Sequence, residues 1–277
     1  DADADPAAEA RSIARLNHPN IVGIHASGHH GAPPRPYLAL EHVPGQTLRQ
    51  RIAEGPGLVE SLRVAREVAG ALDHAHGRSV MHRDLKPENV LLGDDGRVRV
   101  VDFELSALAV RRPDGDARLR GTPAYLAPEL WRREPATPGA DIWALGVMLW
   151  ELCHGERPFT AASPSRLREQ ICAPEPPAQP DTPRVPAAVR QLLGRCLSPH
   201  PAARPGAGEV ARVLSAALTP AAPADAPGTR ALFSGLRALD ERDHGLLVGR
   251  DEVVAALVAR LRTVCALTVV GPPGCGK

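Results

Sequence analysis

The chain has 277 residues, of which 43% are apolar, which is enough to form the cores of about two domains. A formal net charge of +1 provides no basic excess for binding nucleic acid or an acidic membrane, so we expect neither partner. The longest apolar run, 142–150, is about half the ~20 residues that a membrane-spanning helix needs. Five cysteines without C-x-x-C spacing argue against a zinc site or disulfide framework and favour a reducing, cytoplasmic location.

The first predicted elements are a short helix over 9–16 and two β-rich runs, 21–24 and 37–43, separated by a Gly/Pro loop. Apolar residues then recur at helical spacing from 62 to 75. This pattern predicts an amphipathic helix that ends at Gly77.

A hairpin and a buried helix are predicted next. The apolar runs 90–92 and 98–101 flank Asp95-Gly96, a strong turn signal. Residues 142–152 are apolar on every side of a helix, which predicts burial in the middle of a domain. Further helices are expected over 165–171, 187–197 and 208–218.

The composition changes after the last of these helices. A stretch rich in Pro, Ala and Asp begins at Thr219 and has no periodicity, which is typical of a linker. A helix over 251–262 and an apolar strand over 266–270 follow it. We therefore expect one domain over 1–218, a linker over 219–244 and the start of a second domain over 245–277.

The strongest motif is His82-Arg83-Asp84-Leu85-Lys86-Pro87-Glu88-Asn89. Phosphoryl transfer from ATP needs a positioned hydroxyl and neutralisation of charge. Asp84 would accept the substrate proton, Lys86 would steady the moving phosphoryl group, and Asn89 would hold a metal. The predicted hairpin ends at Asp102, which adds a second metal ligand. A charge-rich connection without function is the alternative, but the order and spacing favour the catalytic interpretation.

From Glu9 to Leu218 the sequence resembles the bacterial, eukaryotic-like (Hanks-type) Ser/Thr protein kinases. The resemblance implies an α+β, bilobal fold with ATP in the cleft between an N-terminal lobe, incomplete here, and a mainly helical C-terminal lobe. Catalytic roles fall on Asp84, Lys86 and Thr122, and the Mg²⁺ ligands are Asn89 and Asp102. Lys86 favours Ser/Thr over Tyr substrates. The implied nucleotide contacts are the gatekeeper Leu40, the hinge residues Glu41 and Val43, and Leu91.

The same resemblance assigns structural roles. Asp141 would hold the main chain of the catalytic loop, and Glu129 would pair with Arg204 to anchor the end of the activation segment. A hydrophobic spine that joins the lobes would consist of Ile13, Ile24, His82 and Phe103.

Two departures from the family pattern bear on activity. The Gly-rich loop and the strand with the ATP-binding lysine would precede Glu9, so we expect the 277 residues alone to be nearly inactive. Glu104 also follows Asp102-Phe103 where the family has Gly. A glutamate there resists the torsions that glycine allows, and its charge would either repel phosphates or join the metal shell. Both alternatives stay open.

The second nucleotide motif is Gly271-Pro272-Pro273-Gly274-Cys275-Gly276-Lys277, directly after the apolar strand. Gly271, Gly274 and Gly276 would let backbone N–H groups surround phosphate, and Lys277 would reach the outer phosphates. The run 248–251 before a helix resembles the entry to AAA+ and related signalling ATPases, which have an α/β P-loop fold. The alternative is a glycine-rich tail.

The sequence as a whole therefore predicts an ATP- and Mg²⁺-dependent Ser/Thr protein kinase, acting on protein substrates in the cytoplasm of a bacterium and fused to a signalling ATPase. The alternative is a pseudokinase that relays signals to the ATPase without transferring phosphate. The intact catalytic loop favours the enzyme, whereas Glu104 favours the pseudokinase.

Overall fold

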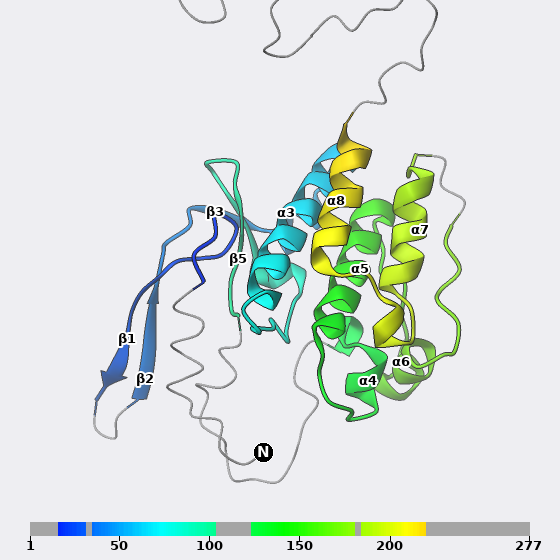
Figure 1. The fold of residues 1–277 in the computed structure, drawn as a ribbon, viewed down its shortest axis with the longest axis horizontal. Helices are drawn as coiled ribbons and strands as arrows, with labels where there is room; N and C mark the ends of the chain where they lie inside the picture. Colours follow the sequence, from blue (N-terminus) through cyan, green and yellow to red (C-terminus); the bar gives the residue numbers. More distant parts are fainter. Residues whose placement is uncertain (1–15, 32–34, 104–122, 181–183, 220–277) are drawn as a thin grey trace, which may run out of the picture. The chain divides into compact units, whose positions relative to one another are not determined.

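A computed structural model of the chain describes residues 16–31, 35–103, 123–180 and 184–219 (Figure 1). The chain divides into two compact units, Asp1–Pro220 and Ala221–Lys277, and all described residues belong to the first. Several predictions lie outside the described residues. They are the helix over 9–16 up to residue 15, with Ile13, the residues Glu104 and Thr122, and everything after Thr219, including Gly271, Gly274, Gly276 and Lys277.

The described strands form two antiparallel sheets. One is a hairpin of β1 (Ile24–His30) and β2 (Arg35–Leu40), and the other has the order β3-β4-β5, with β3 (Gly45–Thr47), β4 (Val90–Gly93) and β5 (Val98–Val100). The predicted hairpin around Asp95-Gly96 is confirmed: Val90 pairs with Val100, and Gly96 has a φ of 76° that glycine adopts without strain.

The prediction of a strand over 21–24 is wrong in position, because β1 begins only at Ile24. Ile21 and Val22 are buried beside β5, where Ile21 forms a parallel bridge to Val100 and the Val22 N–H donates to the Val100 carbonyl at 3.0 Å. The residues of β1 itself have little strand propensity, and pairing with β2 makes them a strand.

The five predicted helices that fall within the described residues are present, with small shifts of their ends. They are α3 (Leu58–His76), α5 (Pro138–His154), α6 (Pro164–Ile171), α7 (Ala187–Cys196) and α8 (Ala207–Leu218). α3 lies alongside both α5 and α8 (Figure 1). α5 is buried from Ala140 to Leu152, as the unbroken apolar pattern predicted. A side chain at Gly146 would put its Cβ 2.8 Å from Cβ of Cys196, so glycine lets α7 approach α5 closely.

The sequence reading missed β3 and several short helices. These are α2 (Leu48–Ala53), α4 (Pro128–Trp131), and the 3-10 turns η1 (Pro87–Asn89), η3 (Pro123–Tyr125) and η4 (Pro201–Ala203). α2 begins with a capping box, in which the Gln50 N–H donates to Thr47 Oγ1 at 3.3 Å and the Thr47 N–H donates to Gln50 Oε1 at 2.8 Å. The T-x-x-Q pattern of Thr47 to Gln50 is a sequence signature of a helix start, and it could have predicted α2.

The described unit thus mixes helices with antiparallel strands, as predicted. In Figure 1 the strands lie to the left of α3, and α4 to α7 lie to its right. The chain passes from α3 into the predicted catalytic loop and leaves it through the β4–β5 hairpin, so both rigid elements fix the loop's two ends. Among the described residues no helix has both the length and the apolarity to cross a membrane.

Candidate active site

Asp84 and Lys86 form the centre of the candidate site. Lys86 Nζ lies 2.7 Å from Asp84 Oδ2, and both side chains are partly exposed. The Asn89 amide nitrogen donates to the main-chain carbonyl of Asp84 at 2.9 Å and lies 3.4 Å from Oδ2 of the same residue. The turn η1 bends the chain so that these three side chains converge. The structure therefore brings together the three motif residues that the sequence selected.

His82 fixes the start of this loop. Its Nε2–H donates to the Val101 carbonyl at 2.9 Å, and its Nδ1 accepts the Asp84 N–H at 3.3 Å. One donor and one acceptor are what a neutral imidazole offers. Complete burial lowers the His82 pKa, which keeps the ring in this form. The ring packs on Phe103 with a centroid distance of 4.7 Å, which is one contact of the predicted spine.

A buried carboxylate holds the backbone between His82 and Asp84. Asp141 on α5 accepts the N–H of His82 at 2.8 Å and the N–H of Arg83 at 2.9 Å, as the resemblance implied. His76, at the end of α3, places Nε2 2.8 Å from the same carboxylate. Arg83 has a φ of 65°, a conformation that non-glycine residues seldom adopt. Asp141 therefore stabilises a strained loop from the hydrophobic core.

Asp102 follows directly after a main-chain contact between the second strand of the hairpin and Asn89. The Val101 N–H donates to the Asn89 carbonyl at 3.0 Å, which puts Asp102 one residue beyond that contact. Asp102 also has a left-handed backbone, with a φ of 62°. Because the Asn89 nitrogen is used as a donor to Asp84, its side-chain oxygen is the atom that remains to face a cation. A carboxylate and an amide oxygen are the donor types that Mg²⁺ prefers, so this pair fits the predicted ion.

One pocket connects the predicted gatekeeper Leu40 with Asp102, the predicted metal ligand. Leu40 lines it together with Ile24, Val101, Asp102 and Phe103. Val43 and Leu91 do not line this pocket; both are partly buried, with Leu91 on β4 opposite Thr47 and Val43 close to Gly93. A second pocket lies beside Asp84, and Tyr125 and Leu126 contribute to its wall.

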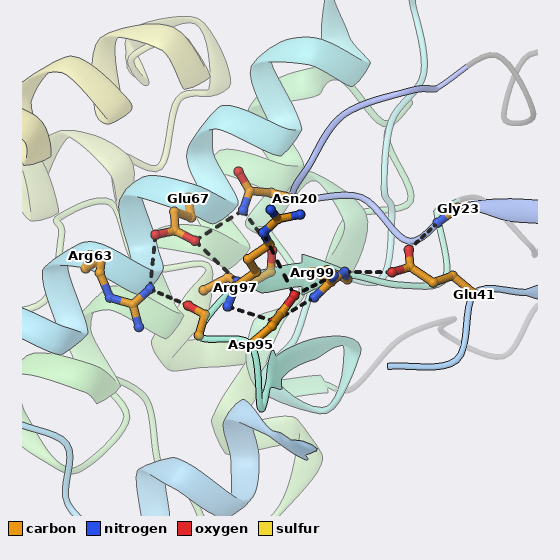
Figure 2. Close-up of polar contacts among 10 residues, drawn as sticks. Asn20, Gly23, Glu41, Arg63, Glu67, Asp95, Arg97 and Arg99 are labelled. Carbon is orange, nitrogen blue, oxygen red and sulfur yellow. Dashed lines mark hydrogen bonds and ion pairs between the residues drawn. The ribbon is translucent and has the colours of Figure 1, made fainter. Parts of the chain in front are cut away.

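The predicted hinge residue Glu41 is held on two sides (Figure 2). Its main-chain N–H donates to the Gly23 carbonyl at 2.8 Å, and its Oε2 accepts the Gly23 N–H at 3.3 Å. Its Oε1 lies 3.0 Å from Nε of Arg99 on β5. The sequence reading did not identify Arg99, because its contact depends on pairing between distant strands.

A second arginine that sequence reasoning missed joins four elements. Arg49 on α2 lies 2.8 Å from Glu88 in the catalytic loop and 2.7 Å from the buried Glu151 on α5, and it also bonds the Tyr125 hydroxyl. Burial opposes the charge of Arg49, but the bonds to Glu151 and Glu88 outweigh it and raise its pKa. Tyr125 donates to Glu151 at 2.6 Å. The sequence did contain one indication of this contact. Glu151 is a single acidic residue in the apolar helical run 142–152, and a buried carboxylate needs a cation or a hydrogen-bond donor.

The predicted ion pair between Glu129 and Arg204 is confirmed. The two guanidinium nitrogens lie 2.7 and 2.8 Å from the two carboxylate oxygens, and both side chains are buried. Arg204 also donates to the carbonyls of Ser198 and Gly139 at 2.9 Å each. This bidentate pair ties the start of α4 to the turn before α8.

Comparison with known proteins agrees with this geometry. Residues 2–213 match the family model described as "Protein kinase domain". The chain is 37% identical over 200 residues to serine/threonine-protein kinase PknL of Mycobacterium tuberculosis, covering 71% of this chain and 50% of that protein. It is 35% identical over 218 residues to serine/threonine-protein kinase pkn3 of Myxococcus xanthus, with 73% and 39% covered.

A third relative, probable serine/threonine-protein kinase pknA2 of Bifidobacterium longum, is 32% identical over 273 residues, covering 95% of this chain and 34% of that protein. The chain thus spans between about a third and a half of the length of these relatives.

Proposed function

This chain belongs to the protein kinase family, and we propose that it transfers the γ-phosphoryl group of ATP to Ser or Thr hydroxyls of protein substrates. The observation that carries the proposal is the contact of Lys86 with Asp84, beside an asparagine whose amide is also bound to Asp84. Asp84 supplies a proton acceptor, Lys86 a cation and Asn89 an oxygen ligand, all within six residues of the chain. Three relatives with Ser/Thr kinase names support the substrate class.

In the proposed reaction the substrate hydroxyl occupies the pocket beside Asp84. Asp84 accepts the hydroxyl proton as the oxygen bonds to the γ-phosphorus and the bond between that phosphorus and the β–γ bridging oxygen breaks, leaving ADP. Lys86 neutralises charge on the phosphoryl oxygens as they move. Asn89 and Asp102 would hold Mg²⁺, which neutralises the triphosphate when bound.

The remaining roles follow the resemblance. Leu40, Glu41, Val43 and Leu91 are proposed to contact the adenine nucleotide in a cleft between two lobes, and Thr122 to bridge Asp84 and Lys86. The pocket shared by Leu40 and Asp102 supports a nucleotide that reaches from hinge to metal. We propose the kinase domain at 1–218 and a linker at 219–244. A cytoplasmic location also remains a proposal, to be tested by cell fractionation.

For 245–277 we propose the start of an α/β P-loop ATPase domain. The G-x-x-x-x-G-K run that ends at Lys277 supports it. A P-loop also needs the N-terminus of a following helix, so the test uses full-length protein. Because Asp84→Asn should leave ATP bound at the kinase site, calorimetry on this variant should detect two ATP sites, of which Lys277→Ala removes one. If Lys277→Ala leaves binding unchanged, the motif is a glycine-rich tail.

The alternative function is a pseudokinase, which Glu104 favours because it replaces the family's glycine beside the metal ligand. The deciding experiment supplies full-length protein with labelled ATP and Mg²⁺ or Mn²⁺, alone and with generic protein substrates. Phosphoamino-acid analysis should find phosphoserine or phosphothreonine. Protein that binds ATP without transferring phosphate would establish the pseudokinase.

A further inference from the structure

A line of polar contacts connects helix α3 to the hinge by way of the β4–β5 hairpin (Figure 2). At the α3 end, Glu67 Oε2 accepts the Asn20 side-chain nitrogen at 3.1 Å and the Val98 N–H at 3.3 Å. The same Asn20 nitrogen donates to the Val98 carbonyl at 2.8 Å. The start of β5 is therefore bound to α3 directly through the Val98 N–H, and through the Val98 carbonyl by way of Asn20.

The turn of the hairpin is bound to α3 as well. Arg63 Nη1 lies 3.1 Å from the Gly96 carbonyl and 3.1 Å from Glu67. Next to this turn, Asp95 accepts the Arg97 N–H at 3.0 Å and both terminal nitrogens of Arg99, at 3.1 and 2.8 Å. Asp95 thereby orients the Arg99 side chain from one end of the guanidinium group.

Arg99 contacts the hinge residue Glu41 through the Nε edge of its guanidinium group. Its Nε lies 3.0 Å from Glu41 Oε1, and the Arg99 side chain is only 11% exposed. Glu41 in turn binds Gly23 through its main-chain nitrogen and through Oε2. A planar guanidinium can contact two carboxylates at once, one along Nε and one along the terminal nitrogens. A lysine ammonium at this position would reach only one of them well.

The strand that carries Arg99 also leads to the proposed metal site. Asp102 is three residues further along, and the intervening Val101 is bonded through its N–H to Asn89 and through its carbonyl to His82. Residues proposed to bind opposite ends of ATP are thus joined through one short piece of chain. Main-chain bonds of Glu41 to Gly23 and of Val22 to Val100 also join the hinge to β5, and the contact of Glu41 with Arg99 is the side-chain link that adds to them.

We propose that Arg99 is a positioning residue for nucleotide binding, which holds the hinge through Glu41 at a set distance from the strand that ends at Asp102. This inference rests on the proposed function, because it needs an adenine nucleotide that spans hinge and metal. A binding site whose two ends are fixed beforehand loses less entropy when the ligand binds. Release of Glu41 should therefore weaken ATP binding while leaving Asp84 and Lys86 in place.

The test measures steady-state kinetics of full-length Arg99→Gln with ATP and protein substrate varied separately. The KM for ATP should rise by about 3- to 10-fold. This is less than the full contribution of a charge-assisted hydrogen bond, because Glu41 is one-third exposed and solvent weakens its contact with Arg99. The kcat and the KM for protein substrate should change less than about twofold, since no group that contacts the phosphoryl acceptor is altered. A purely structural role would instead lower the active fraction and leave the KM for ATP unchanged.

Two further variants make the result specific. Glu41→Gln removes the charge from the other side and should raise the KM for ATP similarly, and the double variant should be no worse than either single one. Arg97→Gln is the matched control, because Arg97 is 66% exposed and its side chain lies 3.9 Å from Asp95; its KM for ATP should be unchanged.

Each remaining outcome has a meaning. An unchanged KM for ATP in well-folded Arg99→Gln and Glu41→Gln, additive effects in the double variant, or a rise in kcat would overturn the positioning role. If Arg99→Gln does not fold, Glu41→Gln alone decides. If the parent transfers no phosphate but binds ATP, calorimetry on the same variants tests the positioning role although the proposed function has failed. A parent that does neither contradicts both.

Discussion

The carboxylate of Asp141, buried in helix α5, accepts the main-chain N–H of Arg83 at 2.9 Å. Arg83 needs such support because its φ of 65° is costly for a residue with a Cβ. The same carboxylate also bonds the His82 N–H, so the backbone just before the proposed catalytic aspartate is fixed from the core of the domain. The geometry at Asp84 therefore depends on a residue of α5 as well as on its own loop.

Replacing Asp141 with Ala should disturb both stability and catalysis. Two main-chain N–H groups would lose their acceptor, at about 1–3 kcal/mol for each group that stays buried and unbonded. We expect the free energy of unfolding, measured by urea titration, to fall by several kcal/mol. The kcat should fall at least tenfold, a size typical for misplaced catalytic groups. Asp141→Asn should be milder, because the amide oxygen still accepts one bond. Equal kcat values for Asp141→Ala and the parent would show that the loop keeps its shape without this support.

The ion pair of Glu129 and Arg204 predicts that removing one partner alone destabilises the protein more than the loss of a surface charge would. Removing the arginine with Arg204→Met would leave the Glu129 carboxylate buried without a cation, at a cost of roughly 3–5 kcal/mol. Replacing both with apolar residues, Arg204→Met with Glu129→Leu, should cost clearly less than the sum of the single changes. Denaturant titration of the four proteins measures this difference. Additive losses would mean that the two side chains act independently despite their 2.7 Å contact.

The buried His82 predicts a loss of stability in acid. Burial holds its pKa in the folded protein below the ordinary value of 6.5. As pH falls below that value, the unfolded chain binds a proton that the folded chain refuses. The contribution of His82 to the free energy of unfolding therefore decreases toward acid, by at most on the order of 1 kcal/mol per pH unit. Above neutrality this contribution is constant. Protonation would also turn Nδ1 from an acceptor for the Asp84 N–H into a donor.

His82→Phe is the test, since it keeps an aromatic ring against Phe103 and cannot titrate. Its stability should be lower than the parent's at pH 8, but its decline between pH 7 and 5 should be less steep. Some slope must remain, because burial also lowers the pKa values of His18, His74 and His154. Parallel stability curves for the two proteins would rule out His82 as a source of acid sensitivity.

The parts of the fold that could be predicted are those encoded within a short stretch of chain. α3 and α5 follow from helical spacing and from an apolar run, and the β4–β5 hairpin follows from Asp95-Gly96. β3 could not be predicted in this way, because three residues become a strand only by pairing Gly45 with Gly93 far along the chain. The run 21–24 was predicted as a strand, but Ile21 and Val22 precede β1 and are buried beside Val100 of β5.

The site divides in the same manner. Asp84, Lys86 and Asn89 lie within six residues and could be assigned together. In contrast, Arg99 contacts Glu41, and Arg49 contacts Glu88 and Glu151, all more than thirty residues away in sequence. An arginine on a strand or short helix carries no local sign of the carboxylate that it will meet. Asp141 was found only because the family resemblance pointed to it.

The central claim is that Asp84 performs phosphoryl transfer, and one comparison tests it most directly. Full-length Asp84→Asn keeps the shape of the side chain but removes the proton acceptor, so transfer of labelled phosphate should fall by about 10²- to 10⁴-fold. Asp94→Asn, an equal change at an exposed residue of the hairpin turn, should retain the parent's rate. ATP binding should survive in both variants. If Asp84→Asn transfers phosphate as fast as Asp94→Asn, the proposed catalytic role of this loop is wrong.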